Sequence, residues 1–177
     1  MVDAESSTLF PGDSDGMGRL WTPHRMVYLN KETGDTGCPF CVAPTRSDED
    51  GLIVARGTTA YVIMNLYPYN SGHIMVCPYR HVATYDLATA EEVAEIGMLS
   101  QIAMRVLTEA TGCVGFNLGM NQGEVAGAGI AEHLHQHIVP RWRNDANFFP
   151  IIAQTKALPR LLGEVRELLA KHWPAES

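Results

Sequence analysis

Three histidines stand at every second position in the second half of the chain, and imidazole can act as a nucleophile or a proton carrier near pH 7. They are His133, His135 and His137. Because a β-strand turns alternate side chains to opposite faces, the spacing predicts one strand with all three rings on the same face, ended by Pro140. A surface hairpin or a structural zinc site would show the same spacing, so the histidines alone leave the chemistry open.

The segment before the histidines is rich in glycine, and residues 123–129 read GEVAGAG. Such a loop can turn several backbone N–H groups toward an anion. We expect the N–H groups around Ala128 and Gly129 to receive the negative charge that develops on a bound phosphate, as in an oxyanion hole. Together, the loop and the histidines favour a site with chemistry over a surface hairpin.

Two cysteines two residues apart, Cys38 and Cys41, form either half of a tetrahedral zinc site or a redox pair. A thiol oxidoreductase carries this pair at the start of a long helix that follows a buried strand. Here the preceding residues 30–37 and the following residues 45–50 both have the composition of a loop. The sequence therefore favours zinc over redox chemistry, and a redox role remains the alternative.

The elements that must position these residues can be predicted from apolar periodicity and turn residues. Thr89 and Glu92 form a capping box that begins a long helix, which Gly112 is expected to end. Pro159 is expected to open a last helix. Besides the histidine strand, strands are predicted at 52–56, 59–65, 73–77 and 113–120. The result is an α+β domain, an antiparallel sheet with helices at one side.

The composition limits the class of protein and of partner. The chain has 177 residues, 46% of them hydrophobic, which suits a single domain with a sizeable core. Residues 1–18 are expected to be a flexible tail and residues 19–177 one domain. A net charge of −7 without a basic run argues against a nucleic-acid polymer, and no apolar run suits a membrane span or a signal peptide. We expect a soluble, cytoplasmic protein in which Cys77 and Cys113 are buried free thiols.

The pattern His-Φ-His-x-His-Φ-Φ resembles the signature of the histidine triad (HIT) family of nucleotide hydrolases and transferases. Residues 20–23, 65–70, 78–81 and 140–142 resemble its diadenosine tetraphosphate phosphorylase/hydrolase-like branch, so the resemblance runs from about residue 19 to the C-terminus. It implies a HIT-like fold, usually paired into a homodimer, and an enzyme that cleaves a dinucleoside polyphosphate by phosphorolysis or hydrolysis. Its partners would be a nucleotide and, for phosphorolysis, inorganic phosphate.

The resemblance also implies roles for individual residues. His135 would attack phosphorus and form a nucleotidyl-histidine, while His137 and His73 would hold phosphate oxygens. The nucleotide would be contacted by a further set of residues: Asn65, Leu66, Asn121, Gln122, Ala128 and Gly129. In zinc-containing members a closed structural zinc site would correspond to Cys38, Cys41, His81 and His133.

Two positions depart from the family pattern. Gln136 replaces the usual apolar residue, but on a strand it faces away from the triad. Residues 128–131 (AGIA) lack the Ser or Thr whose hydroxyl usually meets the phosphates, which leaves the preferred acceptor undetermined. A nucleotide-binding regulator with little turnover is the other class that the sequence leaves open.

Overall fold

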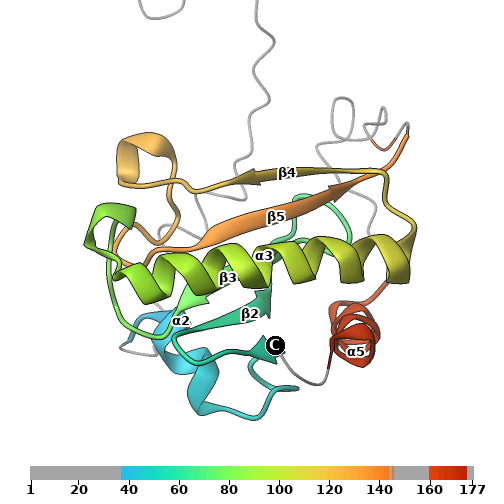
Figure 1. Ribbon diagram of the computed structural model, residues 1–177, viewed down its shortest axis with the longest axis horizontal. Coiled ribbons are helices and arrows are strands. Elements are labelled where there is room, and N and C mark those ends of the chain that lie inside the picture. Colours follow the sequence, from blue (N-terminus) through green and yellow to red (C-terminus); the bar gives the residue numbers. More distant parts are fainter. Residues whose placement is uncertain (1–36, 144, 146–159, 175–177) are drawn as a thin grey trace, which may run out of the picture.

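The structure is a computed structural model that describes residues 37–143, 145 and 160–174. The expected tail, residues 19–36 and Pro159 lie outside the described residues. The centre is a five-stranded sheet in the order β1-β2-β3-β5-β4, with every neighbouring pair antiparallel (Figure 1). The strands are β1 (Ile53–Arg56), β2 (Ala60–Met64), β3 (Ile74–Pro78), β4 (Gly115–Gly119) and β5 (Gln136–Arg141). The predicted fold class is confirmed, and so are the positions of β1 to β4 to within one or two residues.

Helix α3 (Ala90–Thr111) begins and ends at the residues that the sequence predicts. The Thr89 hydroxyl accepts a hydrogen bond from the Glu92 backbone N–H, and the Glu92 carboxylate accepts one from the Thr89 N–H. At the other end Gly112 has φ of 68°, a left-handed conformation that glycine adopts without steric cost. The helix is therefore fixed at both ends by local chemistry.

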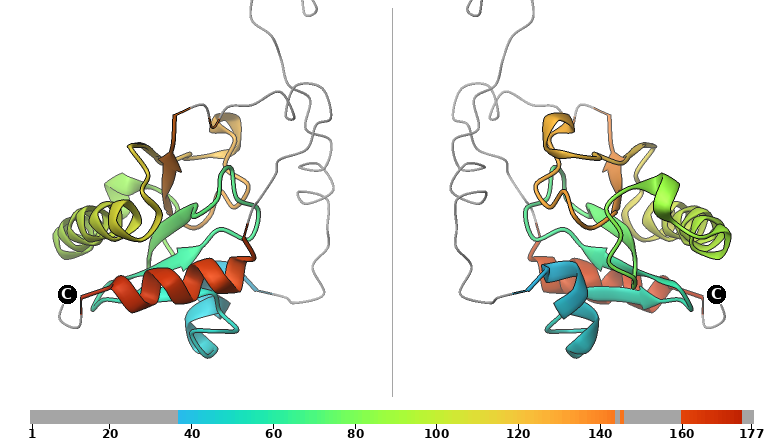
Figure 2. Two further views of the ribbon diagram at one scale, coloured as in Figure 1. Left: turned by 90° about the vertical axis from the view of Figure 1, so that its right-hand side faces the viewer. Right: turned by 90° about the vertical axis from the view of Figure 1, so that its left-hand side faces the viewer.

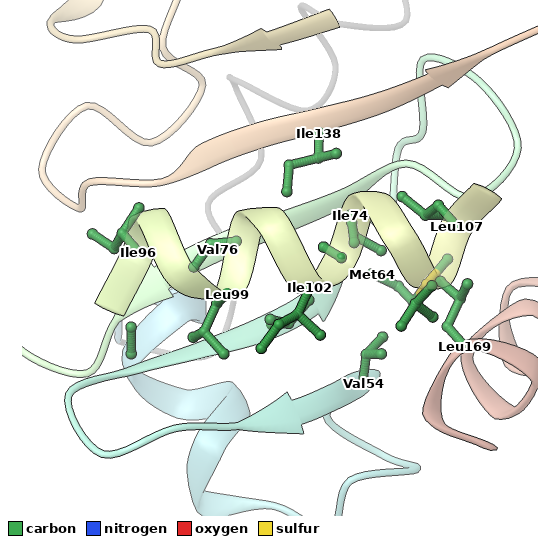
Figure 3. Packing of buried hydrophobic residues seen from close by; sticks show 14 of the residues in the cluster. Val54, Met64, Ile74, Val76, Ile96, Leu99, Ile102, Leu107, Ile138 and Leu169 are labelled. Carbon is green, nitrogen blue, oxygen red and sulfur yellow. The ribbon is translucent and has the colours of Figure 1, made fainter. Parts of the chain in front are cut away.

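The main hydrophobic core lies between α3 and one face of the sheet (Figure 3). Ile96, Leu99 and Leu107 of the helix are almost completely buried against the strands. Helix α5 (Leu162–His172) packs beside α3 and β1 and adds Leu169 to the same core. Burying each such side chain contributes about 1.5–3 kcal/mol, so this face fixes the position of the sheet.

The opposite face of the sheet carries a smaller core and the histidines. Two short elements cover part of it, α2 (Pro39–Val42) and the 3₁₀ turn η1 (Ala43–Thr45). In Figure 2 α2 and α3 lie apart, on either side of the strands. His137 is paired in register with Met75, which belongs to this second core. The sequence predicted helices on one side only and did not predict these short helical turns.

The histidine strand begins and ends later than predicted, since β5 passes through Pro140, which is paired with Phe116, and ends at Arg141. β5 begins at Gln136, so His133 and His135 lie in the segment that leads into it. The pairing of β5 with β3 stops at Gln136 and Val76, two residues before β3 ends at Pro78. Beyond this point the Leu134 N–H donates to the carbonyl oxygen of Val82, and the carbonyl oxygen of Pro78 contacts the His133 ring. The alternation of faces nevertheless continues, since Leu134 points into the main core.

None of the described helices has both the length and the apolar sequence required to cross a membrane.

Candidate functional site

His135 has the geometry of a neutral imidazole with one nitrogen available for attack. Its side chain is 5% exposed, and its Nδ1 lies 2.8 Å from the backbone oxygen of His133. A carbonyl oxygen can only accept, so Nδ1 carries the proton and Nε2 keeps its lone pair. Burial lowers the pKa of His135 below its ordinary value of 6.5, which favours the neutral ring. Nε2 is therefore a competent nucleophile near neutral pH.

His73 and His137 form a directed pair whose tautomers follow from the donors that face Nδ1 of His73, of which the Tyr69 amide is the nearer. The N–H of Tyr69 donates to Nδ1 of His73 over 3.0 Å, so this nitrogen is unprotonated. Nε2 of His73 therefore carries the proton and donates to Nδ1 of His137, 2.9 Å away. Nδ1 of His137 accepts, which leaves the proton of His137 on Nε2. This chain of hydrogen bonds from Tyr69 through His73 to His137, here called the histidine relay, leaves Nε2 of His137 able to donate a hydrogen bond.

His73 lies deeper in the site than its expected contact with phosphate suggests. We expected His73 to hold phosphate oxygens, but its side chain is completely buried and its Nε2 contacts His137. Any influence of His73 on a ligand would pass through His137, whose own side chain is partly exposed. The exposed ring of Tyr69 packs over both, with centroids 4.7 Å from His73 and 5.6 Å from His137. Sequence reasoning missed Tyr69, because its contribution comes from a backbone amide.

His135 and His137 are neighbours. The ring centroids of His135 and His137 are 4.9 Å apart and their planes are nearly perpendicular, at 82°. A phosphate group in front of both rings could be attacked by one and receive a hydrogen bond from the other. The predicted alternation thus brings these two histidines to one site, although only His137 belongs to β5.

Four residues from three distant segments gather into a group that could hold a metal ion: Cys38, Cys41, His81 and His133. Their ligand atoms all lie within 4.8 Å of one another. Nε2 of His133 is 2.9 Å from the carbonyl oxygen of Pro78, so it carries the proton and Nδ1 points its lone pair at the thiols. Nδ1 of His133 lies 3.3 Å from Sγ of Cys38, and Nδ1 of His81 lies 3.3 Å from Sγ of Cys41. The set fits a tetrahedral metal site without an open position.

The cysteine turn is packed directly on His135. Phe40, between the two cysteines, has its ring centroid 4.9 Å from that of His135 and 5.5 Å from that of His133. Its carbonyl oxygen accepts a hydrogen bond of 2.6 Å from the buried hydroxyl of Tyr61. The sequence analysis did not predict these contacts of Phe40 and Tyr61. The aromatic residue inside the Cys-x-x-Cys turn could have indicated that the turn packs on other rings.

Asn65 and Leu66 lie where the chain leaves β2, next to the histidine pair. The side-chain oxygen Oδ1 of Asn65 accepts a hydrogen bond from the Tyr67 N–H over 2.9 Å and so caps the turn, while its Nδ2 is 3.3 Å from Nδ1 of His73. Leu66 is 58% exposed, which leaves its side chain available for contact with a ligand.

The glycine-rich loop is more closed on itself than expected. It contains a 3₁₀ turn, η3 (Glu124–Ala126), and the N–H of Ala128 points to the carbonyl oxygen of Gly123 over 3.4 Å. Among the described residues, Gly129 has no backbone partner for its N–H. The side-chain oxygen of Gln122 accepts a hydrogen bond from the N–H of Tyr85 over 2.8 Å, and Asn121 next to it is partly exposed. The loop therefore offers fewer donors than its composition suggests.

Comparisons with known proteins agree with this geometry. A family model described as HIT domain matches residues 46–144. The chain is also 46% identical over 180 residues to the AP-4-A phosphorylase of Mycobacterium tuberculosis, covering 96% of this chain and 92% of that protein. The chain belongs to the histidine triad family. The resemblance noted from the triad motif is thereby confirmed.

Two further proteins show a more distant similarity to this HIT protein. The bis(5'-adenosyl)-triphosphatase of Dictyostelium discoideum is 33% identical over 86 residues, which cover 49% of this chain and 57% of that protein. A solved Zn-bound histidine triad family protein from Mycobacterium smegmatis superposes with a TM-score of 0.64 at 24% identity, covering 79% of this chain and 95% of that one. At that identity the solved structure supports the HIT fold alone.

Proposed function

We propose that this HIT protein cleaves dinucleoside polyphosphates, with diadenosine tetraphosphate as the first candidate, through a nucleotidyl-histidine intermediate on His135. The observation that carries the proposal is that the Nε2 atoms of His135 and His137 complement each other, one as an acceptor and one as a donor. Nε2 of His135 has a lone pair, and Nε2 of the adjacent His137 has a proton. The relative at 46% identity, which is named for AP-4-A phosphorolysis, supports the substrate.

In the first step, Nε2 of His135 attacks the α-phosphorus. A P–N bond forms and the bond from phosphorus to the bridging oxygen breaks, while His137 donates its proton or a hydrogen bond to the departing polyphosphate. The carbonyl oxygen of His133 stabilises the positive charge that the His135 ring acquires, because it accepts from Nδ1–H. We assign binding of the nucleotide and its phosphates to Asn65, Leu66, Asn121, Gln122 and the N–H of Gly129.

In the second step an acceptor attacks the same phosphorus, the P–N bond breaks and His135 is regenerated. Inorganic phosphate as acceptor gives ADP and ATP from diadenosine tetraphosphate, whereas water gives AMP and ATP. His137 takes back a proton from the acceptor. The loop before the triad supplies no hydroxyl, since residues 128–131 are Ala, Gly, Ile and Ala, so backbone N–H groups would have to hold the phosphates there.

We further propose that Cys38, Cys41, His81 and His133 hold a structural zinc ion. Two sulfur and two nitrogen ligands are the set that zinc prefers, and four protein ligands leave no position for substrate. Bound zinc would cross-link the cysteine turn to the segment that carries His135.

A homodimer in the cytoplasm is our proposal for the assembly and location. The resemblance to the HIT family motivates the dimer, and twofold symmetry would be its simplest form. Light scattering at micromolar concentration should give twice the mass of the 19.4 kDa chain, and a monomer mass would contradict the proposal.

The experiment that tests the function is product analysis with diadenosine tetraphosphate, with and without inorganic phosphate. ADP that appears only with phosphate means phosphorolysis, and AMP plus ATP means hydrolysis. The variant H135A should form neither, while H172A, which removes a histidine of α5 outside the site, should behave as wild type. No turnover by wild type would overturn the proposal in favour of a nucleotide-binding regulator.

A further inference from the structure

The loop of residues 65–72 supplies the amide that directs the histidine relay, so whatever holds this loop also acts on the relay. Asn70, next to Tyr69, is its main anchor. Its Nδ2 donates to the carbonyl oxygen of Pro140 over 3.1 Å and to Oδ2 of Asp145 over 2.9 Å. Its own backbone oxygen accepts from the N–H of His73 over 3.2 Å. One side chain therefore links the loop to the far end of β5.

Asp145 is built to stay a carboxylate in a fixed position. Arg141 donates to both of its oxygens, from Nε over 2.7 Å and from Nη2 over 2.8 Å, and the N–H of Trp142 donates over 3.0 Å. The Arg141 guanidinium holds the pKa of this carboxyl well below its usual range. The same Arg141 donates from Nη1 to the Asn117 side chain in β4, 2.8 Å away. Asp145 is thus anchored to two strands before it meets Asn70.

The loop also has little room to move on β5. Gly72 has φ of 75°, and a Cβ there would meet side-chain atoms of Leu107 at 3.3 Å and Pro140 at 3.4 Å. This close approach holds the end of the loop on Pro140 by packing, and Asn70 holds the same end by its hydrogen bonds to Pro140 and Asp145. Tyr69 directly precedes the Asn70 anchor in the chain.

We propose that Asp145 is a positioning residue that acts through Asn70 to hold the Tyr69 amide on Nδ1 of His73, and so sets which nitrogen of His137 carries the proton. The path contains only the contacts described above: Asp145 to Asn70, the adjacent Tyr69 N–H to His73, and His73 to His137. Its effect on turnover rests on the proposed function, whereas its effect on the tautomers does not. The Asp145 side chain itself bonds to Asn70, Arg141 and the Trp142 N–H and not to an imidazole, so its role is to position the histidines.

The direct test is the tautomer of each imidazole, read by long-range ¹H–¹⁵N correlation spectra of labelled protein without substrate. Wild type should show His73 and His137 both protonated on Nε2. In N70A and D145A the His137 signals should move toward the average of the two tautomers. The matched control is D48N, which removes another aspartate paired with an arginine, Asp48 with Arg56, and should leave the signals unchanged.

Steady-state kinetics with diadenosine tetraphosphate give the second readout. N70A and D145A should each lower kcat about tenfold with KM changed by less than about threefold, as for loss of a group that orients a functional histidine. If Asp145 acts through Asn70, the double variant should be no slower than the slower single variant.

Wild-type tautomers in folded N70A would overturn the proposal, and so would additive losses of kcat. N70A leaves the Arg141–Asp145 pair intact, so its spectra test the proposal even if D145A does not fold. If wild type lacks turnover altogether, the spectra still test the positioning role, so failure of the function and failure of this inference remain distinguishable.

Discussion

At the scale of single residues, the direction of each hydrogen bond decides which imidazole attacks and which one donates. Nε2 of His135 has the lone pair, so H135A should lower kcat by about 10⁴-fold, as is common when a nucleophile is removed. Nε2 of His137 is only a donor, so H137A should lose about 10²–10³-fold. Substrate affinity should survive in both. Steady-state and single-turnover kinetics check this order.

The covalent intermediate gives an independent check on the same residues. Quenching wild type with α-labelled substrate should trap an acid-labile, base-stable label on His135, and H137A should trap the same label more slowly. Label on another residue, or turnover unchanged in H135A, would falsify the assignment.

The types of the site residues could be predicted from the sequence, but the direction of their contacts could not. Alternation along an extended segment placed His135 and His137 on one face, and the Cys-x-x-Cys spacing marked the cysteine pair. The role of His73 as partner of His137 depends on the backbone amide of Tyr69, whose position is set by the folded loop. Likewise the N–H of Ala128 meets Gly123 only because η3 forms.

At the scale of elements, the first turn of α3 joins the helix to the segment that carries His81. Glu92, 4% exposed, accepts from Nε of Arg80 over 3.0 Å and from Nη2 over 2.8 Å, while Arg80 also donates to the carbonyl oxygen of Leu87. Hydrogen bonding from Arg80 lowers the pKa of Glu92. A lowered carboxyl pKa adds stability above the unfolded pKa of about 4.3, and that stability is lost as the pH falls through the folded pKa.

The expected result is a gap in stability that depends on pH. E92Q should have a lower free energy of unfolding than wild type at pH 7, and the gap should shrink as the pH falls below about 4. T89A, which removes the uncharged half of the same capping box, should lose about 1 kcal/mol with little change over this range. Urea unfolding at several pH values measures both variants. A gap for E92Q that is constant with pH would contradict the role of its charge.

Elements were predictable where their signals are local. The capping box and Gly112 define α3 without any tertiary contact, and the structure confirms both ends. The start of β5 was predicted wrongly because it depends on where β3 offers a partner, which is a tertiary property. The short elements α2 and η1 were missed because four and three residues are too few for a periodic pattern.

At the scale of the whole molecule, the proposed metal joins segments that are far apart in sequence. Cys38 and His133 are 95 positions apart, and Cys41 and His81 are 40 apart. Such a site exists only in the folded chain, so its binding free energy adds to the free energy of unfolding. It would also hold Phe40 against His135, so loss of the metal should loosen the nucleophile as well as the fold.

Metal removal should therefore lower stability and activity together. Tag-free protein should contain one zinc per chain, and chelation should lower Tm by about 10 °C, the shift expected for roughly 4 kcal/mol in a domain of this size. C41S should behave like the chelated protein. C113A, which removes a buried thiol outside the ligand group, should keep its zinc and its response to chelation. Elemental analysis measures the zinc content, thermal unfolding measures the Tm, and turnover of diadenosine tetraphosphate measures the activity. Protein that contains no metal, has a titratable dithiol and keeps its Tm in chelator would contradict the structural zinc and favour a redox role for Cys38 and Cys41.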